Sequence, residues 1–173
     1  MYSRSGLYEA LKHEESHRHP RFLTVMLLDI DYFKSINDNY GHECGDSVLA
    51  AFAGKVQHVV GEDGIVARMG GEEFVVVVNS GDVRQGVELA ERIRETIASH
   101  PFSWRQQTLF LTVSIGLGSA KAESWQLTDV FNTLLAEADD YLYRSKKAGR
   151  NRTSARQPND RPAVGEGKNP ERV

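Results

Sequence analysis

Apolar positions recur along most of the chain at spacings typical of helices and strands. A short amphipathic helix is expected over about residues 6–17, ending before Pro20. Residues 21–31, RFLTVMLLDID, form a nearly continuous apolar run that ends in two aspartates, which predicts a central strand covered on both faces. Residues 32–46 are polar and turn-rich, with a helical turn or two inside them. Apolar residues then return at helical spacing over residues 47–61.

The second half of the chain continues this alternation of helical and extended patterns. Two β-branched runs, residues 65–69 and 74–78, flank the sequence Gly-Gly-Glu-Glu, which is typical of a β-hairpin. Periodicity then predicts an amphipathic helix, a strand and a long amphipathic helix, over residues 82–100, 108–120 and 127–150. The apolar side of the last helix is expected to contain Leu134, Leu135, Ala138, Leu142 and Tyr143.

The order of these elements indicates the fold class. Helices alternate with strands, and a central hairpin accompanies a strand that ends in acid. The sequence therefore predicts an α/β (α+β) fold with a central mixed or antiparallel sheet flanked by helices, similar to a palm or ferredoxin-related sheet. Periodicity leaves the strand order open. The pattern stops after about residue 152, so we expect a domain over residues 1–152 and a disordered tail over residues 153–173.

Composition narrows the function classes. A chain of 173 residues with 40% apolar and 26% charged residues is typical of one globular domain. The net charge of −3 gives no general case for binding nucleic acid or a membrane surface. The one cysteine, Cys44, cannot form an internal disulfide, which suits a reducing compartment. No apolar run is long enough to span a bilayer and no signal peptide is evident, so a cytoplasmic domain is expected.

Two acidic pairs lie where the predicted strands end. Asp29 and Asp31 share a face if their strand continues that far, because side chains alternate along a strand. Glu72 and Glu73 lie at the hairpin corner, beside two glycines that would let the backbone approach a triphosphate. Clustered carboxylates repel one another unless a cation lies among them, and such hard oxygen ligands favour Mg²⁺. A tight hairpin turn with solvated charges remains the alternative on these residues alone.

The loop after the first strand is the second dense group of polar residues. Lys34 lies five residues after Asp29 and could reach a phosphate. Asp46 only accepts hydrogen bonds, so it could pair with the N1–H and N2–H₂ donors of guanine, which adenine lacks, and Asn37 can both donate and accept. The competing interpretation makes these residues helix caps and turn formers, with Asp46 as an N-cap and His42 in a structural role. Taken singly, each residue favours that structural interpretation.

Four segments together resemble one known family. DIDYFKSINDNYGHECGDSVL, ARMGGEEF, LTVSIGLG and EADDYLYRSKKAGRNR follow the order and spacing of the GGDEF domain of diguanylate cyclases, here in its GGEEF form. The resemblance runs from about Tyr2 to Asn151. It implies a palm-like fold related to class III nucleotide cyclases, and a reaction that condenses two GTP into cyclic di-GMP with release of two pyrophosphates. It also implies one GTP per protomer across a two-fold homodimer, because the product is itself two-fold symmetric.

The resemblance also implies a role for each motif residue. The metal ligands would be the carboxylates of Asp29 and Glu72 and the carbonyl of Ile30, with two Mg²⁺ expected in each site and Mn²⁺ as a substitute. Glu73 would aid metal binding or accept the 3′-OH proton, and which glutamate is the base stays open. Lys34 would stabilise charge on the phosphates. The other expected substrate contacts are Phe33, Asn37, His42, Asp46, Gly70, Gly71, Lys146 and Arg150.

Two departures from the family pattern carry expectations of their own. Many relatives have an Arg-x-x-Asp product-inhibition motif before the glycines, whereas Gly61 and Gly64 stand at those positions here. We therefore expect no feedback through that primary inhibitory site, and we interpret Arg92 as a solvated helix residue rather than a secondary product contact. The usual opening, Asp-x-Leu-Thr-Gly-Leu, is missing before residue 2. An upstream sensory or dimerising segment is therefore expected, and a membrane anchor in that segment stays open.

Three hypotheses for function follow. The favoured one is an active diguanylate cyclase, because every hallmark position of the motifs is intact. The alternative is a catalytically silent module that binds GTP or cyclic di-GMP and regulates a partner, but degenerate members normally have broken acidic or glycine positions. A plain structural Mg²⁺-binding domain would leave the guanine-reading spacing of Asn37 and Asp46 unexplained.

Overall fold

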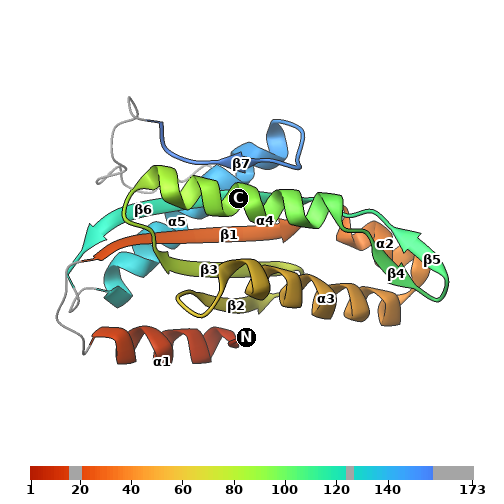
Figure 1. Cartoon of the computed structure of the whole chain (residues 1–173), viewed down its shortest axis with the longest axis horizontal. Helices are drawn as coiled ribbons and strands as arrows, with labels where there is room; N and C mark the ends of the chain where they lie inside the picture. The colour runs from red at the N-terminus through yellow and green to blue at the C-terminus, as the bar shows by residue number, and fades with distance from the viewer. Residues whose placement is uncertain (16–20, 124–126, 158–173) are drawn as a thin grey trace, which may run out of the picture.

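A five-stranded sheet forms the centre of the molecule. The computed structural model describes residues 1–15, 21–123 and 127–157. The strands are β1 (Arg21–Ile30), β2 (Ile65–Gly70), β3 (Glu73–Asn79), β6 (Val113–Ala122) and β7 (Thr153–Ser154), in the spatial order β2-β3-β1-β6-β7 (Figure 1). Strand β1 lies between β3 and β6 and is antiparallel to both, while β7 is parallel to β6. This arrangement confirms the predicted mixed sheet and supplies the strand order that periodicity left open.

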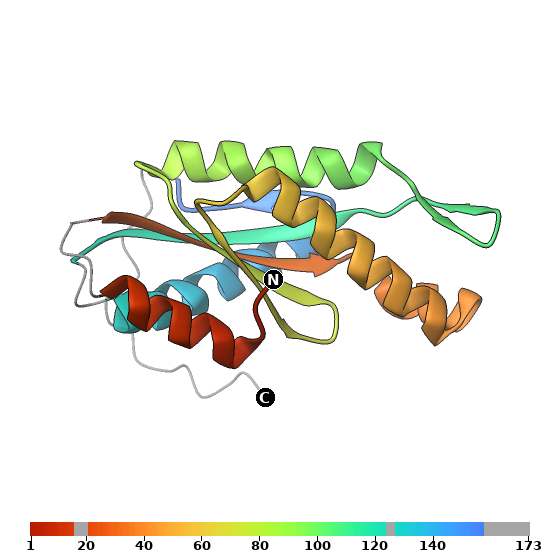
Figure 2. The same ribbon diagram turned by 60° about the horizontal axis from the view of Figure 1, so that its bottom comes forward.

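Helices cover both faces of this sheet. The helices are α1 (Arg4–Glu15), α2 (Phe33–Tyr40), α3 (His42–Val60), α4 (Val83–Ser99) and α5 (Leu127–Lys147). Helices α3 and α4 lie on one face, and α1 and α5 lie on the other (Figure 2). A separate two-stranded hairpin, β4 (Phe102–Trp104) with β5 (Gln107–Leu109), extends from one end of the molecule.

Strand β1 is apolar on both sides because each side has its own core. Met26, Leu28 and Ile30 belong to the cluster under α2, α3 and α4, while Val25 and Leu27 belong to the cluster under α1 and α5. All five side chains are buried. The continuous apolar run of residues 21–30 therefore reflects a central strand covered on both faces, as predicted.

The structure corrects the sequence prediction in the polar loop and in the strand after α4. Helix α3 begins at His42 instead of residue 47, and Gly41 separates it from α2. The strand predicted over residues 108–120 is divided between β5 and β6. Strand β4 was not predicted, because the turn at Arg105 and Gln106, both with positive φ, contains none of the usual turn residues.

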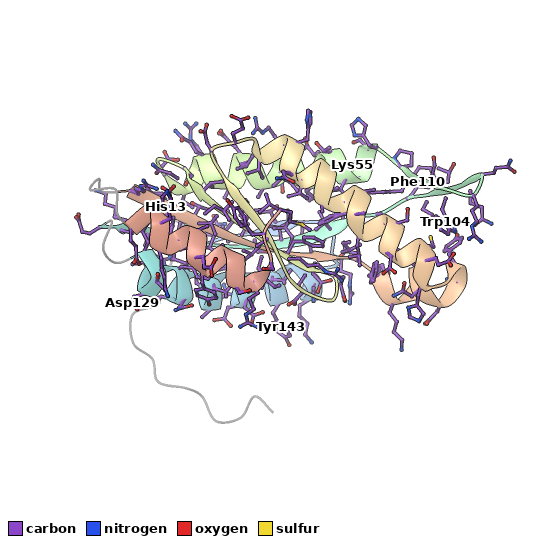
Figure 3. All side chains as sticks on the ribbon, turned by 90° about the horizontal axis from the view of Figure 1, so that it is seen from below. His13, Lys55, Trp104, Phe110, Asp129 and Tyr143 are labelled. Atoms are coloured by element: carbon purple, nitrogen blue, oxygen red, sulfur yellow. The ribbon has the colours of Figure 1, made fainter. Side chains whose placement is uncertain are left out.

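Two further predictions concern the C-terminal part. Tyr143, expected on the apolar side of α5, is 52% exposed and projects outward (Figure 3). The domain boundary at residue 152 stays a prediction, and Thr153 and Ser154, the first residues beyond it, pair with β6 as strand β7. The rest of the predicted tail, residues 158–173, and the predicted helix break at Pro20 lie outside the described residues.

Within the described residues, no helix has the length and apolar character needed to cross a bilayer.

Candidate active site

The acidic residues of two motifs meet at the end of neighbouring strands. Asp29 on β1 lies directly opposite Glu73 on β3, so the two side chains share the sheet face that α5 covers. Glu72 belongs to the turn that precedes Glu73. The predicted neighbourhood of the strand end and the hairpin corner is therefore confirmed, although β1 ends at Ile30, one residue before Asp31.

The hairpin corner depends on its two glycines. Gly70 has φ 148° and Gly71 has φ 54°, conformations that side-chain-bearing residues rarely adopt. Arg68 closes the turn, because its guanidinium donates to the Gly71 carbonyl from Nε at 3.1 Å and from Nη2 at 2.8 Å. This role of Arg68, which lies two residues before the first glycine, was not predicted from the sequence.

A lysine from α5 completes the charged corner. The Lys146 ammonium lies 2.6 Å from the Asp29 carboxylate. Burial raises the pKa of Asp29, while the Lys146 hydrogen bond opposes that rise and the charge of Glu72 adds to it. Burial and the charge of Asp29 likewise raise the pKa of Glu73. The two carboxylates therefore gain from a nearby cation, and Lys146 provides one.

Lys146 reaches the carboxylates because α5 lies unusually close to the sheet. A Cβ atom added to Gly116 on β6 would overlap the backbone of α5 at Ala138 and Leu142. Gly118 is similarly opposite the Leu134 carbonyl. The two glycines of the SIGLG segment thus allow the helix backbone to rest directly on β6.

The donor set at this corner fits a hard divalent cation only in part. Asp29 and Glu72 offer carboxylate oxygens, and Ile30 can contribute only its backbone carbonyl, since its side chain is a hydrocarbon. Among the described residues, no group of three or more histidine, cysteine, aspartate or glutamate side chains is arranged to hold a metal ion. The remaining ligands would have to be phosphate oxygens and water, which is how Mg²⁺ is commonly held with nucleotides.

Basic residues lie on the elements that lead away from this corner. Tyr32, with φ 56°, turns the chain from β1 directly into α2, so Lys34 follows on the first turn of that helix and is exposed. The Arg150 guanidinium lies 4.8 Å from the centre of the Tyr32 ring. Lys146 and Arg150, which are remote from β1 in sequence, are thus placed beside the residues that end β1 and begin α2.

The predicted guanine contacts are on α2 and α3. Asn37 is half-buried on α2, and Asp46 is exposed within α3. The alternative role of Asp46 as an N-cap is wrong, because α3 begins four residues earlier. A Cβ atom at Gly45 would overlap the Asn37 side-chain oxygen, so this glycine makes room for Asn37 next to Asp46. This role of Gly45 was not predicted from the sequence.

The remaining site predictions have clear locations. His42 is the exposed first residue of α3. The Phe33 side chain is buried in the core, so only its backbone could contact a substrate. Gly61 caps the end of α3 and Gly64 immediately precedes β2, so neither inhibitory-motif position carries a functional side chain. Arg92 is exposed on α4.

Comparisons with known proteins agree with this geometry. The family model described as "Diguanylate cyclase, GGDEF domain" matches residues 1–152. The "Probable diguanylate cyclase DgcF" of Escherichia coli (strain K12) is 63% identical over 154 residues, which cover 89% of this chain and 49% of that protein. This chain therefore spans about half the length of that relative.

Solved structures show the same relationship. The "active GGEEF domain of a diguanylate cyclase from Vibrio cholerae" has a TM-score of 0.73 and 31% identity, covering 90% of this chain and 98% of that one. The GGDEF domain of DgcB from Caulobacter crescentus, solved in complex with c-di-GMP, has a TM-score of 0.74 and 29% identity, covering 88% and 90%. The matched motifs, the sheet order and the carboxylate corner show together that this chain belongs to the GGDEF-domain family of diguanylate cyclases.

Proposed function

We propose that this chain is the catalytic domain of a diguanylate cyclase that condenses two GTP into cyclic di-GMP and two pyrophosphates. The cross-strand pair of Asp29 and Glu73, with Lys146 at 2.6 Å from Asp29, carries the proposal. This corner combines carboxylates for a metal and a base with a cation for phosphate, which are the groups that phosphoryl transfer needs. The family resemblance of the whole domain supports it.

The proposed roles follow the location of each group. Asp29, Glu72 and the Ile30 carbonyl would hold Mg²⁺, with two ions per site and Mn²⁺ as a substitute. The metal would supply positive charge for the phosphates and the attacking oxygen. Lys34, Lys146 and Arg150 bind the triphosphate, since Lys146 and Arg150 lie beside the start of α2, which carries Lys34. Glycines at the hairpin corner let the phosphates approach the backbone.

The guanine base is proposed to lie against α2 and α3. Asp46 accepts from the base, and Asn37, seated over Gly45, supplies an amide that donates or accepts. His42 lies at the start of α3 and contributes a further substrate contact. Adenine offers no N1–H or N2–H₂ donors, so this arrangement favours GTP over ATP.

Proton removal is proposed to occur at the hairpin corner. The 3′-oxygen of one GTP attacks the α-phosphorus of the other, the new P–O bond replaces the bond to pyrophosphate, and the 3′-OH proton passes to Glu73. Glu73, directly opposite Asp29 on β3, is the carboxylate proposed to accept it. A second, symmetric transfer closes the ring.

The reaction requires two copies of the domain. Each protomer holds one GTP, and a two-fold homodimer brings the two half-sites face to face, because the product has the same symmetry. We also propose that a domain upstream of this one in the full-length protein controls this encounter, since this chain spans only 49% of the Escherichia coli relative. Because Gly61 and Gly64 occupy the positions of the inhibitory arginine and aspartate, the domain lacks feedback through that site.

The experiment is an assay of the purified chain with GTP and Mg²⁺, with cyclic di-GMP and pyrophosphate separated by chromatography. The wild-type chain is expected to form both products, and Glu73→Gln to lose at least about 100-fold in rate, because general base catalysis contributes that much or more. The variant should keep its GTP affinity and circular dichroism spectrum. A Glu73→Gln protein that turns over GTP at the wild-type rate would contradict the assigned role.

A further inference from the structure

The chain adopts a strained turn immediately after α5. Gly149 has φ 120°, Arg150 has φ 63° and Asn151 has φ 45°, so three successive residues occupy positive φ. Glycine and asparagine tolerate this region, but it is costly for arginine. A residue held in such a conformation requires surrounding contacts that fix it, and these are common where geometry matters for function.

A buried aspartate supplies one of these contacts. The Asp31 carboxylate is 5% exposed and accepts three hydrogen bonds. Thr112 Oγ1 and Ser114 Oγ donate to it, each at 2.6 Å; Thr112 immediately precedes β6, and Ser114 is the second residue of that strand. The backbone N–H of Asn151 donates to it at 3.0 Å. Asp31 therefore fastens the strained turn to the ends of β1 and β6.

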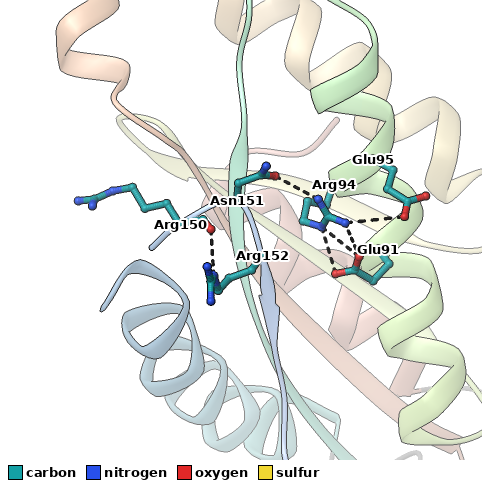
Figure 4. A network of polar contacts seen from close by, with 6 residues as sticks. All are labelled: Glu91, Arg94, Glu95, Arg150, Asn151 and Arg152. Atoms are coloured by element: carbon teal, nitrogen blue, oxygen red, sulfur yellow. Dashed lines mark hydrogen bonds and ion pairs between the residues drawn. The ribbon is translucent and has the colours of Figure 1, made fainter. Parts of the chain in front are cut away.

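An arginine from α4 supplies a second contact to the same turn. Arg94 Nη1 donates to the Asn151 side-chain oxygen at 3.2 Å. Glu91 fixes the Arg94 guanidinium through bonds of 2.6 to 3.1 Å, and the Arg150 carbonyl accepts from Arg152 Nε at 3.0 Å (Figure 4). Asn151 is thus held from the sheet by its backbone and from α4 by its side chain.

This anchoring leaves the Arg150 side chain directed away from the network. Figure 4 shows it extending to the side opposite Arg94. Its guanidinium lies 4.8 Å from the centre of the Tyr32 ring, at the residue that follows Asp31. Asp31 therefore connects two chain segments. One is the turn that carries Arg150, and the other contains Tyr32, whose ring the Arg150 guanidinium contacts.

We propose that Asp31 is a positioning residue for the substrate phosphates. It holds the turn at Arg150 and Asn151 in its left-handed conformation, so that the Arg150 guanidinium is presented beside Tyr32 to the triphosphate of GTP. This inference rests on the proposed function, since it assigns GTP to this site. Asp31 touches no reacting atom and acts through Arg150.

A different role, as a further carboxylate ligand of the metal, fits the contacts less well. Oδ2 of Asp31 already accepts two hydrogen bonds and Oδ1 accepts one, so three of the four lone-pair directions of this buried carboxylate are used by protein donors. The Asp29 carboxylate, by contrast, holds the flexible ammonium of Lys146, which can move to a phosphate.

The test is a double-mutant cycle on nucleotide affinity. Asp31→Asn, Arg150→Met and the double variant are titrated with Mg²⁺ and a GTP analogue that has a non-cleavable α–β bridge. Each single change is expected to lower affinity about tenfold, as for the loss of one bond to a charged group, and the double variant to bind no more weakly than Arg150→Met. Independent, multiplying losses would overturn the proposal.

A matched control removes a charge elsewhere. Asp129→Asn makes the same chemical change on the exposed first turn of α5 and should leave nucleotide affinity unchanged. Loss of affinity in Asp129→Asn equal to that in Asp31→Asn would mean that net charge, rather than positioning, is responsible, and would overturn the proposal. Guanosine, which has no phosphate, should bind wild type and Asp31→Asn equally, and a matching loss for guanosine would also overturn it.

A milder variant covers the case in which Asp31→Asn does not fold. Thr112→Val removes one donor to Asp31 and keeps the carboxylate. It should accelerate hydrogen exchange at the Asn151 amide. It should also lower the affinity for the GTP analogue, but only in a chain that retains Arg150. Unchanged exchange and affinity would overturn the inference alone. If the wild-type chain binds the analogue but forms no cyclic di-GMP, the proposed function is overturned. The affinity measurements would still test the positioning role of Asp31, because they do not depend on turnover.

Discussion

Asp29 is paired with an ammonium group where the proposed reaction requires a divalent cation. Lys146 lies at 2.6 Å from its carboxylate, and Glu73 is directly opposite on β3. A lysine is a flexible point charge, so it can neutralise the carboxylates before nucleotide binds and turn to a phosphate afterwards. At the scale of single residues, the corner is therefore arranged to exchange one cation for another.

At the scale of single residues, guanine recognition is tested by a substitution at Gly45. A methyl group there would overlap the Asn37 side-chain oxygen, so Gly45→Ala must displace Asn37. We expect GTP affinity to fall about tenfold, as for one lost hydrogen bond, with little change in pyrophosphate affinity. Isothermal titration with both ligands measures this. Gly54→Ala on the same helix, where an added Cβ meets no neighbour, is the matched control. Equal losses for both ligands, or unchanged GTP affinity, would contradict the assignment.

At the scale of elements, the contacts of α5 decide how the site is assembled. Gly116 and Gly118 let the helix lie against β6, and this brings its last turn to Asp29. The segment after β7 is fastened back to the same helix, because Arg156 lies 2.8 Å from Glu137. Helix α5 is thereby held between β6 and the final segment of the described chain.

Glu137 gives the prediction for pH dependence. Burial raises its pKa, and the nearby Arg156 only partly offsets that rise. A raised pKa in the folded state means that the protonated form favours folding. Its contribution is full below the ordinary glutamate pKa and is lost as pH rises through the raised value. Glu137→Gln removes this titration, so the variant should gain stability relative to wild type between acid and neutral pH.

Urea unfolding of wild type and Glu137→Gln, at acid and at neutral pH, measures the difference in their free energy of unfolding. Other titrating groups are shared by the two proteins and largely cancel. If wild type instead gained stability over Glu137→Gln as pH rises, the ion pair with Arg156 would outweigh burial and the prediction would fail.

At the scale of the whole molecule, the sequence predicted those parts that local patterns encode. The apolar run of β1 indicated a strand buried on both faces, and the glycine corner indicated the β2–β3 hairpin. Strand β7 has two residues, too few to form a pattern, and the turn between β4 and β5 lacks turn residues. These elements depend on tertiary contacts that periodicity does not report.

For the candidate site too, the sequence predicted what short motifs encode but not the contacts between distant residues. The motifs named Asp29 and Lys146, but their ion pair joins residues 117 positions apart, and no local pattern specifies it. The roles of Gly45 and Asp31 likewise appear only when neighbouring elements pack. The sequence therefore predicted candidate reacting groups, whereas the structure shows which residues lie around them.

The central claim is that two copies of this corner act together on two GTP molecules. The most direct test is the initial rate of cyclic di-GMP formation, at saturating GTP and Mg²⁺, measured across a wide range of chain concentration. Because each protomer supplies one half-site, the rate per chain should rise with concentration until dimers predominate. A rate per chain that is constant down to the lowest concentration, or the absence of product at the highest, would contradict the account.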